Sequence, residues 1–454
     1  MKGAFGTLRR ENALYELQRP ENPSRGGPWS DNAISLRLPP IAPSAYQQAL
    51  DQGLEPPQLT TNTVRFWSDY NHLFYHPRSI VQLNEYELNS SLMPFEKWQT
   101  GEDLFSNLDR EHDLLDRDLR PLLEECDQLQ ALQMFSGIDD AWGGFTARYL
   151  ERISDELGKG CRWVFGLKDG KQNARERQLL QTTNFAQTLY ALDSTASLHT
   201  PLTSVPASLP DYVRLDPSSA WHTSALEAVL MESLTLPTRL RTSEDGRATF
   251  DQLEATLNYE GHRRIVDAEM SIDDPAHLRE QSDHDGVRDT RMTNGIEGHG
   301  QSEGCKLDIN MFANIRSSAN TGGTRLGRRT HVFSKIESMR GGWKSANDIE
   351  NSNAESLDRF SDGPRISFHQ SQLLLPILPS FPRILRFDPN PQSLAVDTTL
   401  STSTAVADRV RDLERITRAL IGIEERETLC DGLASIAEEY EEGWDGSDGS
   451  DDDD

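Results

Sequence analysis

Cysteine is scarce in this sequence: 454 residues contain four, at positions 126, 161, 305 and 430. They are far apart and form no CxxC pair, which excludes a zinc ribbon and a disulfide scaffold and fits a reducing compartment. Long apolar runs are also missing, since none reaches the ~18 residues that a membrane-spanning helix needs. The first residues, Met1–Gly6, contain no apolar stretch, so we predict no secretory signal.

Positive charge is the second deficit. The sequence has 73 Asp and Glu against 46 Lys and Arg, which gives a net charge of -27. Such a chain repels polyanions, so we do not expect direct nucleic-acid binding. Only 36% of the residues are hydrophobic, which predicts a folded core accompanied by solvated stretches. We place these in a polar insertion at about 271–330 and an acidic tail at 438–454.

The apolar pattern predicts an α/β protein. Apolar residues recur at steps of three, four or seven from Leu104 to Leu129, which indicates one helix of about 28 residues, with a kink or break near Leu119 caused by Pro121. A strand, a glycine-containing loop, a helix and a second strand follow, and this order is typical of a parallel sheet. We predict these elements at 129–135, 136–144, 145–157 and 161–167, with further helices at 184–192, 223–234, 250–257 and 406–421.

The loop from Ser136 to Gly144 is the best candidate for chemistry. A glycine turn before a helix directs backbone N–H groups at an anion, so phosphate binding is the functional interpretation. However, Asp139 and Asp140 put negative charge where phosphate oxygens would lie, Trp142 fills space, and the loop matches neither GxGxxG nor GxxxxGK[ST]. A structural turn is therefore favoured. If a nucleotide binds, its candidate contacts are Ser136, Gly137, Gly143, Gly144, Phe145 and Thr146.

Other candidate sites carry less. His72 and His76 are four residues apart, but Pro77 disfavours a helix that holds both, so we predict no metal site. No pattern indicates a catalytic triad or paired carboxylates. Residues 306–344 carry eight Lys or Arg against two acids. This basic patch could bind an external polyanion or the acidic tail, and Arg325, Arg328 and Arg329 are the residues to test.

Several segments resemble tubulins. Residues 96–167 resemble the nucleotide-binding half, 250–257 the intermediate-domain helix, and 404–421 with the acidic tail the C-terminal region. The Misato family of tubulin-like proteins is more similar still. The segments that carry this resemblance are Phe5–Leu8, Phe66–Asn71 (FWSDYN), His76–Ser79 (HPRS), Asp139–Phe145 (DDAWGGF) and Leu209-Pro210.

The resemblance implies a tubulin-like α/β fold: a mainly parallel sheet flanked by helices in an N-terminal domain (1–235), an α+β intermediate region (236–400), a C-terminal helix (401–437) and the tail. It also implies a role in mitochondrial inheritance, with partitioning of the organelle and its DNA and maintenance of mitochondrial distribution and morphology. Family members work in the cytoplasm or at the outer mitochondrial surface, so protein partners at mitochondria are expected.

Two departures from the family bear on function. The family usually begins with a central strand that this chain lacks, which predicts an open sheet edge and exposed apolar surface. The tubulin phosphate loops are rich in glycine and threonine, whereas Asp139, Asp140 and Trp142 stand in one of them here and residues 84–89 contain no glycine. We therefore expect no cofactor and no enzymatic activity. Three hypotheses stay open: an adaptor without nucleotide, a GTPase that polymerises or switches, and a polyanion binder.

Overall fold

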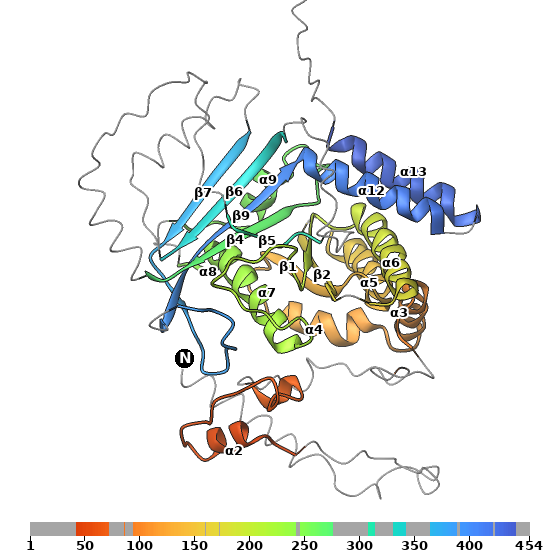
Figure 1. The fold of residues 1–454 in the computed structure, drawn as a ribbon. Coiled ribbons are helices and arrows are strands. Elements are labelled where there is room, and N and C mark those ends of the chain that lie inside the picture. The colour runs from red at the N-terminus through yellow and green to blue at the C-terminus, as the bar shows by residue number, and fades with distance from the viewer. Residues whose placement is uncertain are drawn as a thin grey trace, which may run out of the picture.

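The computed structural model describes residues 42–71, 86, 94–158, 160–171, 173–241, 246–275, 307–313, 330–341, 364–387, 391–420 and 423–441. Its core is built on two sheets (Figure 1). The first is parallel, with the strand order β1-β2-β3. Its strands are β1 (Ala131–Gly137), β2 (Cys161–Lys168) and β3 (Leu198–Thr203). The predicted α/β class with a parallel sheet is thus confirmed.

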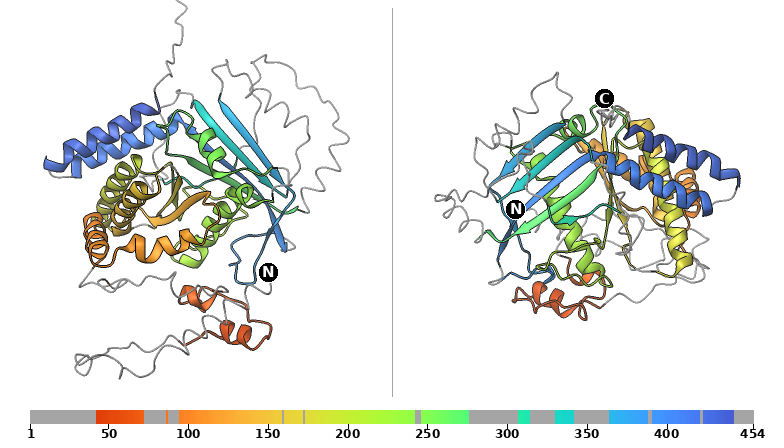
Figure 2. Two further views of the ribbon diagram at one scale, coloured as in Figure 1. Left: turned by 180° about the vertical axis from the view of Figure 1, so that it is seen from behind. Right: turned by 45° about the horizontal axis from the view of Figure 1, so that its top comes forward.

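Helices cover both faces of this sheet (Figures 1 and 2). The helix that follows β1 buries Leu150 and Ile153, three residues apart, against the sheet side, because this spacing puts both on one helical face. One side of the sheet carries α3 (Trp98–His112), α5 (Ala141–Leu157) and α6 (Arg175–Asp193); the other carries α7 (Ala220–Leu234), α8 (Leu236–Arg239) and α9 (Phe250–Leu257).

The second sheet has the order β5-β4-β9-β6-β7, with β8 paired to β9. Its pairs are antiparallel except β6 with β7. Ile309 pairs with Met270 and both are fully buried, so an ordered strand lies inside the predicted insertion at 271–330. The strands are β4 (Asp267–Asp273), β5 (Ile309–Asn310), β6 (Val332–Arg340), β7 (Arg365–Ser371), β8 (Leu375–Pro376) and β9 (Ser393–Ser403).

The single long helix predicted from Leu104 to Leu129 is wrong. The helix α3 ends at His112, because Asp113 adopts a left-handed conformation with φ 47°. A π-helix, η5 (Leu115–Leu119), and a short helix, α4 (Arg120–Glu124), follow. Pro121 breaks nothing, since it lies in the first turn of α4, where its missing N–H costs no hydrogen bond.

The C-terminal region also differs from the prediction of one helix and a tail from 438. Two helices form, α12 (Thr404–Leu420) and α13 (Ile423–Glu439), and they pack on each other and on α6. Order continues through Tyr440, whose side chain is fully buried. Its hydroxyl accepts from the Ile265 backbone N–H at 2.6 Å and donates to the Ile265 carbonyl at 2.9 Å. The end of α13 is thereby fixed beside β4.

We expect Tyr440→Phe to lower the free energy of unfolding by about 1–3 kcal/mol, because it leaves the Ile265 N–H buried without a partner. Urea unfolding measures the difference. Tyr190→Phe is the control: Tyr190 is 40% exposed, and its change should stay within about 0.5 kcal/mol. Equal effects of both variants would contradict the role of the Tyr440 hydroxyl.

The first described segment, residues 42–71, contains α2 (Ala45–Asp51) and the 3₁₀ helix η3 (Trp67–Asp69) within the FWSDYN motif. The buried Asp69 carboxylate accepts from the backbone N–H groups of Arg65 and Phe66 and from the Arg65 guanidinium. The Arg65 hydrogen bond is the main cause that lowers the pKa of Asp69 to about 2. The motif is therefore a structural cap for its own loop.

Candidate functional site

The carboxyl ends of β1, β2 and β3 lie side by side, at the edge where open α/β sheets bind their ligands. Three short segments follow these ends: Ile138–Asp140, Asp169-Gly170 and Ser204-Val205. The loop after β1 leads into α5 and contains most of the predicted nucleotide contacts. Its geometry therefore decides whether a phosphate fits.

Asp140 occupies the start of α5. Its side chain is the N-cap and accepts from the Trp142 backbone N–H at 2.9 Å. A negative charge at this end of a helix is favourable, because the free N–H groups and the helix dipole are positive there. Gly137 makes room for it, since a Cβ at that position would lie 2.7 Å from Asp140 Oδ1. The protein's own carboxylate thus fills the place of a bound anion.

Asp139 is turned inward and is only 5% exposed. Its Oδ2 accepts from the Asp169 backbone N–H at 3.1 Å and from Gln181 Nε2 at 3.0 Å. The backbone of the loop is held as well: Asn184 Nδ2 donates to the Asp139 carbonyl and Thr188 Oγ1 to the Ile138 carbonyl. Side chains of α6 therefore fix the loop from the side away from the sheet.

Both carboxyl groups are shifted toward the neutral form. Burial, followed by repulsion from Asp140, raises the pKa of Asp139 to about 7, although Lys168 opposes the shift. Burial raises the pKa of Asp140 to about 6 against the hydrogen bond from Trp142. These groups accordingly carry a free-energy cost when they ionise in the folded protein.

The paired glycines pack helices against each other. A Cβ on Gly144 would overlap the carbonyl oxygen of Trp98 in α3, and a Cβ on Gly143 would overlap the Thr188 side chain in α6. Gly101 in α3 makes the reciprocal contact, since its Cβ would overlap the Ala141 carbonyl oxygen. Close approach of α3, α5 and α6 therefore explains Gly143 and Gly144 without any ligand.

The other predicted contacts lie within the same turn. Thr146 Oγ1 donates to Ser136 Oγ at 2.5 Å, so these two hydroxyls satisfy each other between β1 and α5. The ring of Phe145 packs edge-on against Phe105 of α3, with 5.3 Å between centroids. Trp142 stays 39% exposed and contacts Phe145 edge-on. The structure brings Ser136 and Thr146 together but places Phe145 away from them, on the helix-packing side.

The family's nucleotide does not fit this arrangement. A phosphate at the start of α5 would meet the Asp140 carboxylate that already caps the helix, with Asp139 and the Asp169 side chain near it, as their mutual effects on pKa show. The glycines that could have opened a cradle are occupied by α3 and α6. Sites that bind phosphate gather N–H groups and cations, whereas this one gathers carboxylates.

Sequence reasoning missed four residues of the same cluster: Lys168, Asp169, Gln181 and Glu227. Glu227 of α7 is 6% exposed, and burial raises its pKa to about 7, a shift that a Ser204 hydrogen bond opposes and Asp169 adds to. Burial lowers the pKa of Lys168. The available signal was that Lys168 and Asp169 directly follow the predicted strand 161–167, at its carboxyl end.

Several predicted features cannot be placed. Arg325, Arg328 and Arg329 of the basic patch, and His72 and His76, lie outside the described residues. Within the described ranges, no group of three or more His, Cys, Asp or Glu is arranged to hold a metal ion. Among the helices of those ranges, none is long and apolar enough to cross a bilayer.

Comparison with known proteins extends the sequence resemblance. Residues 56–240 match a tubulin domain family. The chain is 44% identical to Protein DML1 of Phaeosphaeria nodorum over 463 aligned positions, which cover the whole chain and 88% of that relative. The chain belongs to the Misato family of tubulin-like proteins. Protein dml-1 of Neurospora crassa is 42% identical, again over the whole chain and 88% of the relative, and Protein dml1 of Aspergillus oryzae is 40% identical over 98% and 85%.

Membership of the Misato family explains the two-sheet architecture. The parallel sheet and its helices lie within the part that matches the tubulin domain, up to residue 240, whereas the second sheet and α12–α13 follow it. The carboxylate-filled loop lies inside the matched part. The Misato chain described here therefore keeps the tubulin scaffold around the place where a tubulin phosphate loop would be, with different chemistry in that loop.

Proposed function

We propose that this Misato-family protein is a non-enzymatic scaffold that acts in mitochondrial inheritance, partitioning the organelle and its DNA and maintaining mitochondrial distribution and morphology. It acts at the cytoplasmic face of mitochondria and in the cytoplasm, through protein partners. One observation carries the non-enzymatic part: Asp140 caps α5 where a phosphate would have to bind. The mitochondrial part is supported by the family to which the chain belongs.

The nucleotide content of the purified protein tests the non-enzymatic part. We expect denatured protein to release far less than one guanine nucleotide per chain. Asp140→Asn is the matched variant: asparagine is an equally good N-cap but removes the charge, so the loop should keep its shape. If charge is what excludes phosphate, any nucleotide binding will be stronger in Asp140→Asn. A stoichiometric nucleotide in the unchanged protein would instead establish the GTP-binding alternative.

Gene replacement tests the cellular part. In a fungal cell whose own relative can be switched off, this protein should restore mitochondrial distribution and retention of mitochondrial DNA, and Asp140→Asn should restore them equally. Rescue by a variant that cannot bind nucleotide separates a scaffold from a GTPase. Normal mitochondria in cells that lack the relative would overturn the proposed role.

A further inference from the structure

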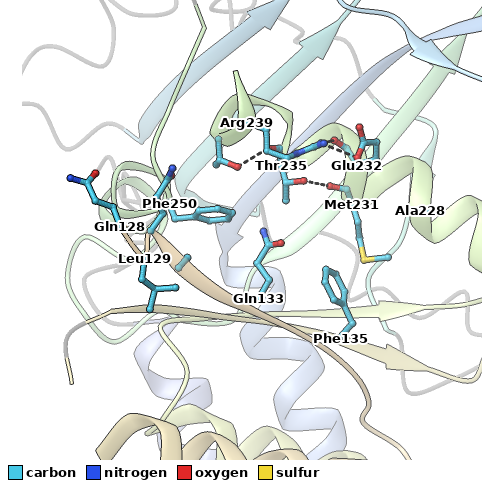
Figure 3. Close-up of a pocket in the computed structure, with 13 residues that line it drawn as sticks. Gln128, Leu129, Gln133, Phe135, Ala228, Met231, Glu232, Thr235, Arg239 and Phe250 are labelled. Atoms are coloured by element: carbon cyan, nitrogen blue, oxygen red, sulfur yellow. Dashed lines mark hydrogen bonds and ion pairs between the residues drawn. The ribbon is translucent and has the colours of Figure 1, made fainter. Parts of the chain in front are cut away.

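The outer edge of β1 borders an open groove of about 690 Å³, the largest hollow among those lined by described residues. Among the described strands β1 pairs only with β2, so its other edge has no strand beside it. Figure 3 shows Gln133 and Phe135 pointing from β1 into the groove, toward Met231 and Thr235 of the α7–α8 region. The groove lies between the edge of a sheet and the helices that would cover one more strand.

An aromatic row ends in this groove. Trp163 and Phe165 of β2 stack at 4.9 Å and are fully buried, and Phe135 of β1 stacks on Phe165 at 5.1 Å. Phe135 is nevertheless 51% exposed, and Leu129, just before β1, is 42% exposed. Cross-strand contacts between neighbouring side chains are what stabilise a sheet, and here the last ring has a neighbour on one side only.

The polar groups of the groove define what could fill it. Arg239 pairs with Glu232 at 2.9 Å, so the charges of the lining neutralise each other. Thr235 and Thr238 donate their hydroxyls to carbonyls of their own helix segment. Gln133 Nε2 is buried and has no hydrogen-bond partner among the described residues. The occupant is therefore uncharged, apolar toward Phe135, and able to offer a carbonyl to Gln133.

We propose that this groove takes up one extended, uncharged polypeptide strand, which pairs with the free edge of β1 and covers Phe135. Only a peptide backbone supplies the alternating donors and acceptors that a strand edge requires. We take the strand from the stretch of the Phaeosphaeria nodorum relative that the alignment with this chain leaves out. The groove lies on the far side of β1 from the α5 start, so this proposal does not depend on the nucleotide question.

Peptides test the proposal with the full chain. Synthetic peptides of about ten residues, a typical upper length for a strand, would tile that unaligned stretch, and fluorescence anisotropy would measure their binding. We expect one apolar, uncharged peptide to bind and to protect the amides of residues 131–137 from hydrogen exchange. Phe135→Ala should weaken binding at least tenfold. Phe66→Ala is the matched control, because Phe66 is 47% exposed elsewhere on the surface, and binding should be unchanged.

N-methylated peptides need no protein variant. In a strand, alternate N–H groups face the same side, so methylation of one alternating set should abolish pairing with β1, while methylation of the other set should preserve it. Equal binding of both methylated forms would show apolar adhesion and overturn strand pairing. Failure of every peptide to bind would overturn the proposal, as would a second copy of the chain occupying the groove, seen as dimerisation that Phe135→Ala abolishes.

Discussion

Gly144→Ala is expected to lower the free energy of unfolding by about 3 kcal/mol, the largest effect of any single substitution proposed for this protein. The new Cβ would overlap the Trp98 carbonyl oxygen and lie 3.0 Å from the Glu102 backbone nitrogen, and backbone atoms inside α3 cannot move aside as a side chain can. Relief requires α3 and α5 to separate, which opens their shared core. Chemical denaturation measures the change.

A matched glycine provides the control. Gly160 precedes β2 and has no atom within 4 Å of the place where its Cβ would lie, so Gly160→Ala should change stability by less than about 0.5 kcal/mol. Gly101→Ala should resemble Gly144→Ala, because the two glycines make reciprocal contacts across the same helix pair. If Gly144→Ala is as stable as the unchanged protein, helix packing does not explain this glycine, and a ligand contact becomes the better explanation.

The second large effect is a loss of stability as pH rises from about 4 to about 7. Burial raises the pKa of Asp139, Asp140 and Glu227 to about 7, 6 and 7, above their usual values near 4. The folded protein therefore holds protons in this window that the unfolded chain releases. Stability from these groups is complete below about pH 4 and is lost as pH passes through the folded-state values.

Glu227→Gln isolates one of the three groups. Glu227 is shifted mainly by burial, whereas Asp139 also faces Lys168, so the effect of Glu227 is the simpler one to interpret. At pH 8 we expect the variant to be about 1–3 kcal/mol more stable than the unchanged protein, and at pH 4 the two should be nearly equal. Thermal unfolding at both pH values measures the difference. An offset that is the same at pH 4 and pH 8 would contradict a role for ionisation.

Local patterns were enough to predict the parallel sheet and most helix positions. The strand–loop–helix–strand order at 131–168 follows from short apolar runs and an intervening amphipathic segment, and α9 begins and ends as predicted. Boundaries failed where one residue's conformation decided them. Asp113 ends α3 in a left-handed turn, and no periodicity of apolar residues can signal such a turn.

The sequence alone determined the fold class, the family and the unusual acidic character of the loop after β1, because strand and helix periods, motifs and charges are local properties of the chain. Tertiary structure decided what these residues do. Asp140 is a helix cap, Gly144 is a helix contact, and Glu227 joins the cluster from α7, more than 80 residues along the chain. Such roles depend on which segments meet in space, and burial there, rather than residue type, sets the pKa of each carboxyl group.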